Sequence, residues 1–528
     1  MTDRRRRGGT TTLATAAGAA VLMTVTMAGC GAGGSSGGTP RSGGTLKVSM
    51  SSALTELDPA KGSANAMAQV GVAIYDTLMK VQKVGDKPTP HIAKSLTASD
   101  DLKTWTMKLP AGVQFSDGTP FDADAVKFNM DRHLDPKTAS TAASLLSSVA
   151  SVRAPDAETV VFKLKYPFAN FPYTLAFDGS GTAGYIASPA ALKKYGKDYT
   201  AHAAGLGPFK LESWAPGKPV TLVRNPNYWN KNQKIRLDKV VISTIADEQA
   251  QYQALQSGTV DVASSIDPTV QKQAKANSSL NYEQGVGSDQ NSIALNMDQP
   301  PFNDPRARQA VSKALNRPEI VALTKEGLTG PAVNLFPKGD PFHNPAADPG
   351  FDLAGAKALV QQYEQATGRP FEFTYTCRAV VNETQVIERQ LAAAGMKLKI
   401  EIQEGATALE TFFGQKYQAT CWSMAGFLTP DLLPYRFFHS SGDLNNMGFK
   451  DKRFDAAADA ARRTADPAEQ KRLWAEADTV LAEQLPWVWT TGQPVAYISR
   501  KTVHSPDLDE PSRLRGRIVE FDDMWLSS

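Results

Sequence analysis

The sequence predicts a mixed α/β protein, because strand-like and helix-like segments alternate along one long chain. Apolar residues alternate with polar ones at Leu46, Val48 and Met50, which is typical of a strand with one buried face. In the segment that begins at Asp304-Pro305, apolar residues recur instead with the 3.6-residue period of a helix. The chain has 528 residues, enough for about three domains at roughly 150 residues each.

The N-terminal segment, residues 1–29, has the features of an export signal. Four consecutive arginines precede an uncharged, weakly apolar stretch from Leu13 to Met27, and small residues stand just before Cys30. This pattern resembles a lipoprotein signal peptide, which implies that Cys30 becomes the mature first residue and carries acyl chains such as palmitate. The alternative is an ordinary secretory signal that leaves Cys30 as a free thiol. The sequence leaves the export route open between the general secretory and the twin-arginine pathways.

A stretch rich in glycine and serine, residues 30–43, follows the signal. It has no residues with which to build a core, so it predicts a flexible tether of about 20 Å r.m.s. length. Without residues 1–29, 53 of the 57 basic and 53 of the 54 acidic residues remain. The body of the protein is therefore neutral, and we expect no nucleic-acid partner. We also expect no later membrane span, since no further segment is long and apolar enough.

The body continues with clear strand and helix signals. Further strands are expected at 105–109 and 160–166, where apolar residues alternate. Asp304 and Asp466 suit helix N-caps, and the proline after each suits the first helical position. Pro486 is expected to end the second of these helices. These alternating elements support the α/β class.

Five sequence blocks resemble, in order, the bacterial extracellular solute-binding proteins of family 5, the receptors of oligopeptide and dipeptide ABC importers. The signature block consists of residues 90–93, 105–109 and 112–126 and contains the turn pair Asp117-Gly118. The other blocks lie at 57–78, 205–229, 296–310 and 485–487. The resemblance covers nearly all of residues 45–500.

The resemblance implies a periplasmic-binding-protein fold of type II, with two lobes joined by a two-segment hinge and an extra inserted domain. It places lobe I at 44–85, 201–287 and 487–528, the inserted domain at 86–200, and lobe II at 288–486. The two crossings are expected near Gly285-Val286-Gly287 and near Pro486-Trp487. Ligand would close the lobes by binding the closed state more tightly than the open one.

Candidate ligand-binding residues follow from the same resemblance. In peptide-binding relatives a strand ends in a Trp, and an Asp after it holds the free amine of the peptide. Trp422 matches the Trp, but Ala425 or Gly426 stands where the Asp is expected. A buried ammonium without a carboxylate is costly, so free-amine recognition would need Asp431 in that role.

The full set of candidates includes an Arg after the expected strand 371–376 and polar residues from a stretch expected to be rich in loops. The alternative for each is a plain place in the lobe core or on its surface. The candidate ligand-binding residues are Arg378, Trp422, Ser423, Asp431, Tyr435, Arg436 and Asn446.

Cys377 and Cys421 fall at the ends of two expected strands of lobe II. Outside the cytoplasm such residues can form a disulfide, and the alternative is two buried thiols. The sequence has no HxxxH, CxxC, Walker loop or GxSxG motif. We therefore expect no metal site, no cofactor and no catalytic residues.

The resemblance implies a non-enzymatic, lipid-anchored receptor on the extracytoplasmic face of the cell membrane. We expect a monomer that captures a solute, with peptide as the first choice, and delivers it to ABC permease subunits. Other solutes stay open, namely a metal chelate, haem or an oligosaccharide. A ligand-sensing surface lipoprotein is a further alternative. A surface enzyme would need a nucleophile with a base, and we find no such arrangement in the sequence.

Overall fold

The computed structural model describes residues 40–527 except 63–64, 84, 178, 180, 286–288, 348–349, 379–381, 404, 425–428, 511–512 and 514–517. The predicted signal segment 1–29, Cys30 and most of the predicted tether 30–43 lie outside the described residues. Within the described ranges, no helix is both long enough and apolar enough to cross a membrane.

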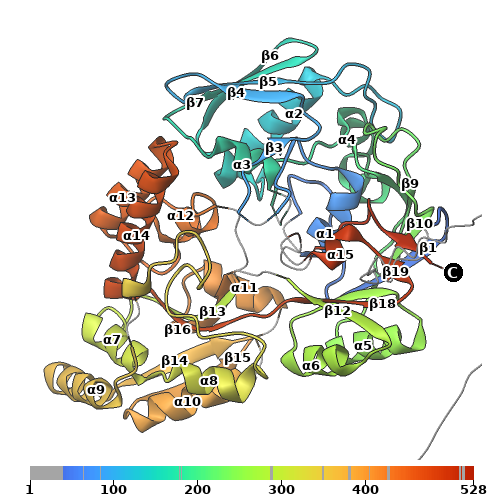
Figure 1. The fold of residues 1–528 in the computed structure, drawn as a ribbon. Helices are drawn as coiled ribbons and strands as arrows, with labels where there is room; N and C mark the ends of the chain where they lie inside the picture. The colour runs from blue at the N-terminus through green and yellow to red at the C-terminus, as the bar shows by residue number, and fades with distance from the viewer. Residues whose placement is uncertain are drawn as a thin grey trace, which may run out of the picture. The chain divides into compact units, whose positions relative to one another are not determined.

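A seven-stranded sheet forms the centre of lobe I (Figure 1). Its strands, in spatial order, are β12 (Leu280–Gln284), β18 (Ala496–Arg500), β11 (Val262–Ser265), β1 (Thr45–Met50), β10 (Lys239–Thr244), β9 (Val220–Arg224) and β8 (Phe209–Ser213). Strand β1 lies in the middle and buries Leu46 and Val48, which confirms the first expected strand. The helices that pack around this sheet are α1 (Asn65–Ile74), α4 (Pro189–Tyr195), α5 (Glu248–Ser257), α6 (Pro268–Ala276) and α15 (Pro506–Asp509).

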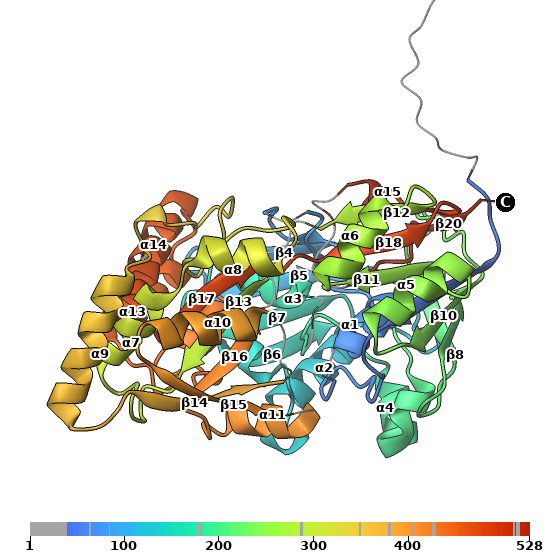
Figure 2. The same cartoon turned by 90° about the horizontal axis from the view of Figure 1, so that it is seen from below.

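Lobe II is built on a five-stranded sheet. In spatial order its strands are β15 (Lys397–Ile402), β14 (Glu372–Cys377), β16 (Ala419–Met424), β13 (Gln290–Leu295) and β17 (Trp487–Gly492). One face is covered by α7 (Pro305–Ala314), α8 (Arg317–Thr324), α9 (Leu353–Thr367) and α10 (Asn382–Ala393); Figure 2 shows α8 and α10 side by side. The other face carries α11 (Gly405–Phe413), α12 (Leu433–Phe438), α13 (Lys452–Arg463) and α14 (Pro467–Gln484).

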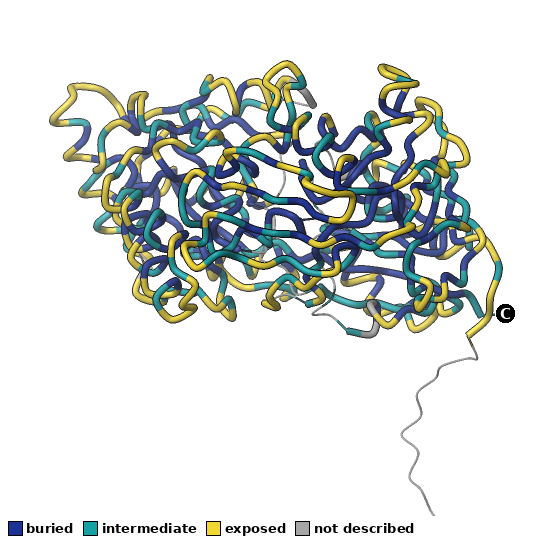
Figure 3. The backbone as a smooth tube through the Cα atoms, turned by 90° about the horizontal axis from the view of Figure 1, so that it is seen from above, coloured by how far each residue is buried: buried dark blue, intermediate teal, exposed yellow. Residues whose placement is uncertain are grey.

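Strands β13 and β17 of lobe II are buried on both faces, whereas the edge strand β15 is largely accessible to solvent. Along β17, Val488 joins the core under α7 to α10, whereas Trp487 and Trp489 join the core under α11 to α14. Successive side chains of a strand point to opposite faces, so a strand covered on both sides is apolar throughout. Figure 3 shows buried residues concentrated along the interior of the chain trace and exposed residues in its outer turns.

The inserted domain contains a four-stranded antiparallel sheet. Its order is β4 (Ser95–Ala98), β5 (Thr104–Lys108), β7 (Thr159–Leu164) and β6 (Val149–Asp156), with helices α2 (Ala123–Leu134) and α3 (Phe171–Ala176). The expected strands at 105–109 and 160–166 are confirmed as β5 and β7. Two short ribbons complete the described strands, β2 (Met79–Lys80) with β3 (Thr89–Pro90) and β19 (Val503–His504) with β20 (Trp525–Leu526).

Aspartate caps begin both helices that the sequence predicted. Asp304 accepts a hydrogen bond from the backbone N–H of Arg306 at 2.9 Å, and Asp466 accepts one from Ala468 at 2.9 Å. A proline occupies the first turn of each helix, where its missing N–H costs nothing. The second helix ends at Gln484, because Leu485 adopts φ of 52° and turns the chain out of the helix before Pro486.

Two of the expected domain boundaries are wrong. The segment 487–492 was assigned to lobe I, but it forms β17 and pairs with β13 in the lobe II sheet. Its apolar side chains are buried between the two helical layers of lobe II, which holds the strand there. The end of the inserted domain also shifts, since Tyr185, Leu192 and Tyr199 pack into the core of lobe I.

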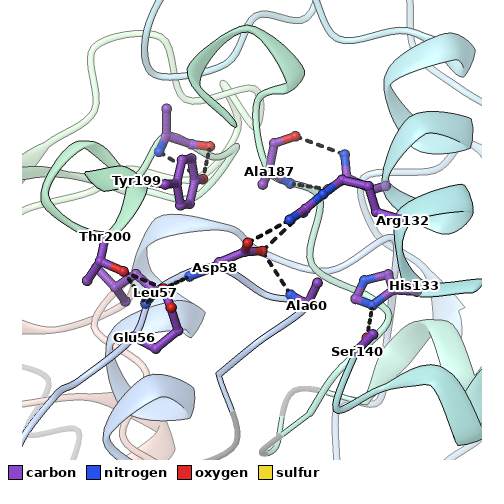
Figure 4. Close-up of polar contacts among 12 residues, drawn as sticks. Glu56, Leu57, Asp58, Ala60, Arg132, His133, Ser140, Ala187, Tyr199 and Thr200 are labelled. Carbon is purple, nitrogen blue, oxygen red and sulfur yellow. Dashed lines mark hydrogen bonds and ion pairs between the residues drawn. The ribbon is translucent and has the colours of Figure 1, made fainter. Parts of the chain in front are cut away.

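A cluster around Asp58, which we call the joint, ties lobe I to the inserted domain (Figure 4). Asp58 accepts two hydrogen bonds from Arg132 of α2, at 2.6 and 3.1 Å, and a third from the backbone N–H of Ala60 at 3.0 Å. The neighbouring His133 is buried, and its Nδ1 lies 2.7 Å from the hydroxyl of Ser140. The two-pronged guanidinium–carboxylate contact fixes α2 against the loop after β1.

Candidate ligand-binding site

The carboxyl ends of the parallel strands gather at one edge of each large sheet. In lobe II, β14, β15, β16 and β17 run parallel and β13 runs against them, so Gln290 at the start of β13 pairs with Met424 and Gly492 at the ends of β16 and β17. In lobe I, β1, β10, β11 and β12 end where β18 begins. We call these the lobe II edge and the lobe I edge. In α/β proteins such edges are where ligands bind.

Two crossing segments, 285–289 and 493–495, join the two edges. They are hydrogen-bonded to each other, from the N–H of Gly285 to the carbonyl of Val495 at 3.0 Å and from the N–H of Gln493 to the carbonyl of Asp289 at 2.8 Å. The first crossing was expected at Gly285-Val286-Gly287, of which only Gly285 lies within the described residues. The second was expected at Pro486-Trp487, which is wrong because β17 first runs through lobe II to Gly492.

A buried ion pair anchors both crossings to lobe II. The carboxylate of Glu383 in α10 lies 2.8 Å from the ammonium of Lys325. It also accepts hydrogen bonds from Thr490 and Thr491 of β17 and from Asn291 of β13, at 2.7, 2.9 and 3.0 Å. Burial by itself would raise the pKa of Glu383, but Lys325 and the hydroxyl donors outweigh it and lower this pKa. The strand ends at the hinge are therefore firmly held.

The lobe I edge presents hydroxyl groups. The hydroxyl of Ser49 donates to the side-chain carbonyl of Gln251 at 3.0 Å, and the Gln251 amide donates to the backbone carbonyl of Ile245 at 2.7 Å. A small cavity at this edge is lined by Ser49, Ser51, Ser52, Ser264, Gln69 and Val519, among others. These groups suit hydrogen bonding to a polar ligand, and they carry no charge.

The register of β14 and β16 brings four predicted residues together on the lobe II edge. Tyr375 pairs with Ala419 and Thr376 with Thr420, so the next pairs along the strands are Cys377 with Cys421 and Arg378 with Trp422. The two cysteines form a disulfide in the structure, with Cα atoms 5.0 Å apart. Beyond it, the exposed Arg378 lies with its guanidinium carbon 5.4 Å from the centre of the Trp422 ring.

Trp422 is part of an aromatic stack rather than a free platform. One face of its ring lies against Phe412 of α11, with ring centres 3.5 Å apart and planes within 6° of parallel. Phe413 meets Trp422 edge-on at 5.9 Å. Ser423 is the next residue along β16 and is exposed. The sequence pointed to Trp422 but missed its two phenylalanine partners.

Further exposed apolar side chains lie on α11 and at the end of β15. Ile402 at the end of β15 is 40% exposed, and Leu409 and Phe413 of α11 are 40% and 48% exposed. Large apolar side chains that stay in water at a strand edge commonly mark a binding surface. The sequence signal for this surface is the Phe412-Phe413 pair at the end of a short apolar helix. Adjacent residues point in different directions from a helix, so a helix that packs through one face buries only one of the two.

Asp431 and Tyr435 lie in a different cluster, which we call the bridge. It joins Tyr166, Phe168 and Asn170 of the inserted domain to Asp431, Tyr435 and Arg462 of lobe II. The buried Asp431 carboxylate accepts a hydrogen bond from Asn170 and lies 3.7 Å from Arg462 Nε. Burial raises the pKa of Asp431, and Arg462 only partly offsets this. In this arrangement Asp431 is already engaged by protein groups.

The remaining two candidates have structural partners. Arg436 forms a two-pronged pair with Asp443 at 2.8 and 3.0 Å. The amide of Asn446 donates to the backbone carbonyl of Phe412 at 2.8 Å and so holds the end of α11. Tyr435 and Arg436 were expected in a loop, but they lie in α12, because Pro434 suits a first helical turn and Phe437 and Phe438 bury the helix.

Comparison with known proteins supports this architecture. The sequence model of the bacterial extracellular solute-binding proteins, family 5 (middle), matches residues 87–445. The glutathione-binding protein GsiB of Escherichia coli K12 is 27% identical over 483 residues, which cover 87% of this chain and 90% of GsiB. GsiB of Salmonella paratyphi A is 29% identical over 478 residues, with the same coverage.

Solved structures share the fold. DppA of Helicobacter pylori, an ABC transporter-associated periplasmic binding protein in complex with the peptide STSA, superposes with a TM-score of 0.82 at 23% identity, over 92% of this chain and 99% of DppA. The oligopeptide-binding protein AppA of Bacillus subtilis, in complex with a nonapeptide, gives a TM-score of 0.79 at 21% identity, over 93% of this chain and all of AppA.

Two lobes, an inserted domain and two crossing segments that meet at the carboxyl edges of both sheets define a periplasmic-type solute-binding protein. The chain belongs to the bacterial extracellular solute-binding proteins of family 5. It is a substrate-binding protein of an ABC importer, and its family binds solutes without catalysing a reaction.

Proposed function

We propose that this protein is a lipid-anchored receptor that captures a short anionic peptide and delivers it to an ABC permease. The relatives named glutathione-binding proteins and the two peptide complexes support a peptide ligand. The single observation that carries the proposal is the pairing of exposed Arg378 with the aromatic stack on the lobe II edge. A peptide carboxylate meets the guanidinium, and an apolar side chain rests on Phe413 and Leu409.

Recognition of the free amine is the weak point of a peptide ligand. The position where relatives carry an Asp lies outside the described residues and holds Ala425 or Gly426, and Asp431 is engaged in the bridge. An organic acid without a free amine is therefore the second candidate. The structures of AgaA with agropinic acid and MoaA with mannopinic acid, at TM-scores of 0.80 and 0.79, share this fold. A neutral oligosaccharide is a lower alternative, since it has no anionic group for the Arg378 guanidinium. A metal chelate or haem stays an alternative, because carboxylates of either would also meet this guanidinium.

The test is calorimetric titration with glutathione, with a tripeptide acid and with the C-terminal amide of the same tripeptide. In Arg378→Ala the acids should bind about tenfold to a hundredfold more weakly, because a charge-assisted hydrogen bond contributes about 1.5–3 kcal/mol. The amide should bind equally to wild type and variant. Arg389→Ala is the matched control, since Arg389 is an exposed arginine of the same lobe that pairs with Glu319. Equal affinity of wild type and Arg378→Ala for the acids would contradict the proposal.

The lipid anchor rests on the sequence around Cys30 alone. Labelling of expressing cells with radioactive palmitate should mark the wild-type chain and leave Cys30→Ser unmarked. The variant should also move from the membrane fraction to the soluble fraction, because one or two acyl chains supply most of the membrane affinity of such a protein. An unlabelled wild-type chain would refute the anchor without touching the solute-binding function.

A further inference from the structure

The bridge is the place where lobe II touches the inserted domain through groups far apart in the sequence. The backbone N–H of Ala169 donates to the carbonyl of Arg462 at 3.0 Å, and a guanidinium N–H of Arg462 donates to the hydroxyl of Tyr166 at 3.2 Å. Asn170 donates to the carboxylate of Asp431. Next to Asp431, Leu432 of lobe II is buried in the core of the inserted domain.

The Arg462 guanidinium is enclosed by two aromatic rings, one from each side of this contact. Its carbon lies 3.2 Å from the ring centre of Tyr435 in lobe II and 5.0 Å from that of Phe168 in the inserted domain. The side chains of Arg462 and Asp431 are 7% and 0% exposed. The contact with Phe168 forms only when the two bodies meet, whereas the contact with Tyr435 lies within lobe II. Both contacts are favourable because water is excluded from them.

Polar atoms of the bridge are incompletely bonded. Among the described residues, neither Nε of Arg462 nor Oδ1 of Asp431 has a hydrogen-bond partner, and the two atoms lie 3.7 Å apart. Separation of the bodies would return both atoms to water and recover their hydration. Burial of apolar groups and the cation–π contacts stabilise the bridge, whereas desolvation of its polar atoms destabilises it. Because these terms oppose each other, the bridge can form and break with a small change in free energy.

The inserted domain and lobe II are connected to lobe I in different ways. The joint fixes the inserted domain to lobe I through Asp58 and Arg132. Lobe II continues into lobe I through the two crossing segments, 285–289 and 493–495. A rotation about these segments would move lobe II against lobe I and the inserted domain together. The bridge would open in that rotation.

We propose that the bridge is a latch that holds the closed state without touching the ligand, and that it sets affinity for all ligands by the same factor. This inference rests on the proposed solute-binding function, because it assumes that closure accompanies binding. Apparent affinity falls in proportion to the population of the binding-competent state. Asp431 and Tyr435 are then closure residues rather than ligand-binding residues.

The test uses the double variant Tyr166→Phe with Asn170→Ala, which removes two polar contacts from the inserted-domain side and leaves the Asp431–Arg462 pair within lobe II. Lys94→Ala is the control, since Lys94 forms an exposed pair with Glu158 on the same domain. X-ray scattering of the full chain without ligand should show a larger radius of gyration for the double variant and no change for Lys94→Ala. Thermal unfolding of each variant checks that it is folded.

Affinity is measured with two probes, glutathione and trialanine. In the double variant, the dissociation constants of both probes should rise by the same factor, about threefold to tenfold. Faster dissociation, rather than slower association, should account for this rise. A change in the ratio of the two constants would overturn the latch, because it would place these residues against the ligand. Unchanged scattering would also overturn it. If neither probe binds the wild type, the proposed peptide ligand fails, while the scattering result still decides the latch.

Discussion

The inserted domain meets lobe I at the joint and lobe II at the bridge, and an Asp–Arg pair of different quality lies at each place. At the joint, Asp58 and Arg132 form two hydrogen bonds at 2.6 and 3.1 Å, and the carboxylate gains a third bond from the backbone. At the bridge both residues belong to lobe II: Arg462 donates to the backbone carbonyl of Asp431 at 2.6 Å, but its Nε lies 3.7 Å from the Asp431 carboxylate. Within the described part of the chain, these two buried side-chain atoms have no hydrogen bond. The difference teaches that residue type does not fix what an ion pair does. An ion pair whose charged groups are hydrogen-bonded to each other suits a permanent connection. An ion pair with unbonded polar atoms suits a contact that opens.

The joint and the bridge also respond to pH in opposite directions. Burial and the neighbouring Arg132 lower the pKa of His133 at the joint to about 4. Burial raises the pKa of Asp431 at the bridge. Acidification therefore destabilises the joint and favours the neutral form of the bridge carboxyl.

The largest expected effect is the loss of the joint pair. Asp58→Ala should lower the free energy of unfolding by about 3 kcal/mol, since it leaves the partly buried Arg132 without its partner. Thermal unfolding followed by circular dichroism measures the change. Lys127→Ala, which removes an exposed pair with Asp131 on the same helix, should change stability by less than about 0.5 kcal/mol. Equal losses in the two variants would break the distinction between a buried joint and a solvated pair.

The next effect is the acid sensitivity of the joint. His133 has a folded pKa of about 4 against an unfolded value of 6.5, so the unfolded state binds a proton first. Stability from this residue is complete above pH 6.5 and declines as pH falls toward 4, by about 3 kcal/mol in all. In His133→Gln this part of the decline should vanish in denaturant titrations at pH 7 and pH 4.5. A decline as steep as that of the wild type would contradict it.

A smaller effect of opposite sign is expected at the bridge. The raised pKa of Asp431 means that the folded state disfavours the charged carboxylate. The neutral carboxyl therefore stabilises the folded protein at low pH, and this stabilisation is lost as pH rises through the pKa that Asp431 has in the folded state. Asp431→Asn keeps an acceptor for Asn170 and removes the charge. It should stabilise the protein by about 1 kcal/mol at pH 8 and by less at pH 4. Destabilisation at pH 8 would show that the Arg462 charge dominates the site.

The smallest effect is expected at a surface pair that joins no domains. Arg436→Ala removes a contact with Asp443, which is 44% exposed on its side chain. Stability should change by at most about 1 kcal/mol, because exposed ion pairs contribute little. Affinity for glutathione should stay the same, in contrast to Arg378→Ala. A loss of affinity in Arg436→Ala would restore Arg436 as a ligand-binding residue and weaken the assignment to Arg378.

Much of the fold could be predicted because its signals are local. Alternating apolar residues marked β1, β5 and β7, and Asp-Pro pairs marked the starts of α7 and α14. The two wrong boundaries share one cause. Trp487 and Tyr185 are apolar residues that suit either of two cores, and their place depends on which helices and strands cover them. Spacing along the chain carries no information on that choice.

The site divides in the same way. The sequence placed Arg378, Trp422 and the two cysteines near strand ends, and strand register then aligned them because β14 and β16 are neighbours. The sequence could not show that Asp431 and Tyr435 belong to a different cluster. They lie only a few residues beyond Trp422 along the chain, yet they take part in the bridge. No sequence motif marked Phe413 or Arg462 as part of a functional site. Phe413 stands at the end of an apolar helix, and Arg462 stands near the charged end of another helix.

The sequence by itself determined the family, the α/β class and the residue types available at the strand ends. These depend on contacts between residues close along the chain and on blocks of residues that recur in order. Only the tertiary structure decided which Asp–Arg pair is saturated, which aromatic rings stack and where the chain crosses between lobes. Those outcomes depend on distances of a few tenths of an ångström between segments separated by up to about three hundred residues, which burial and hydrogen-bond geometry settle together.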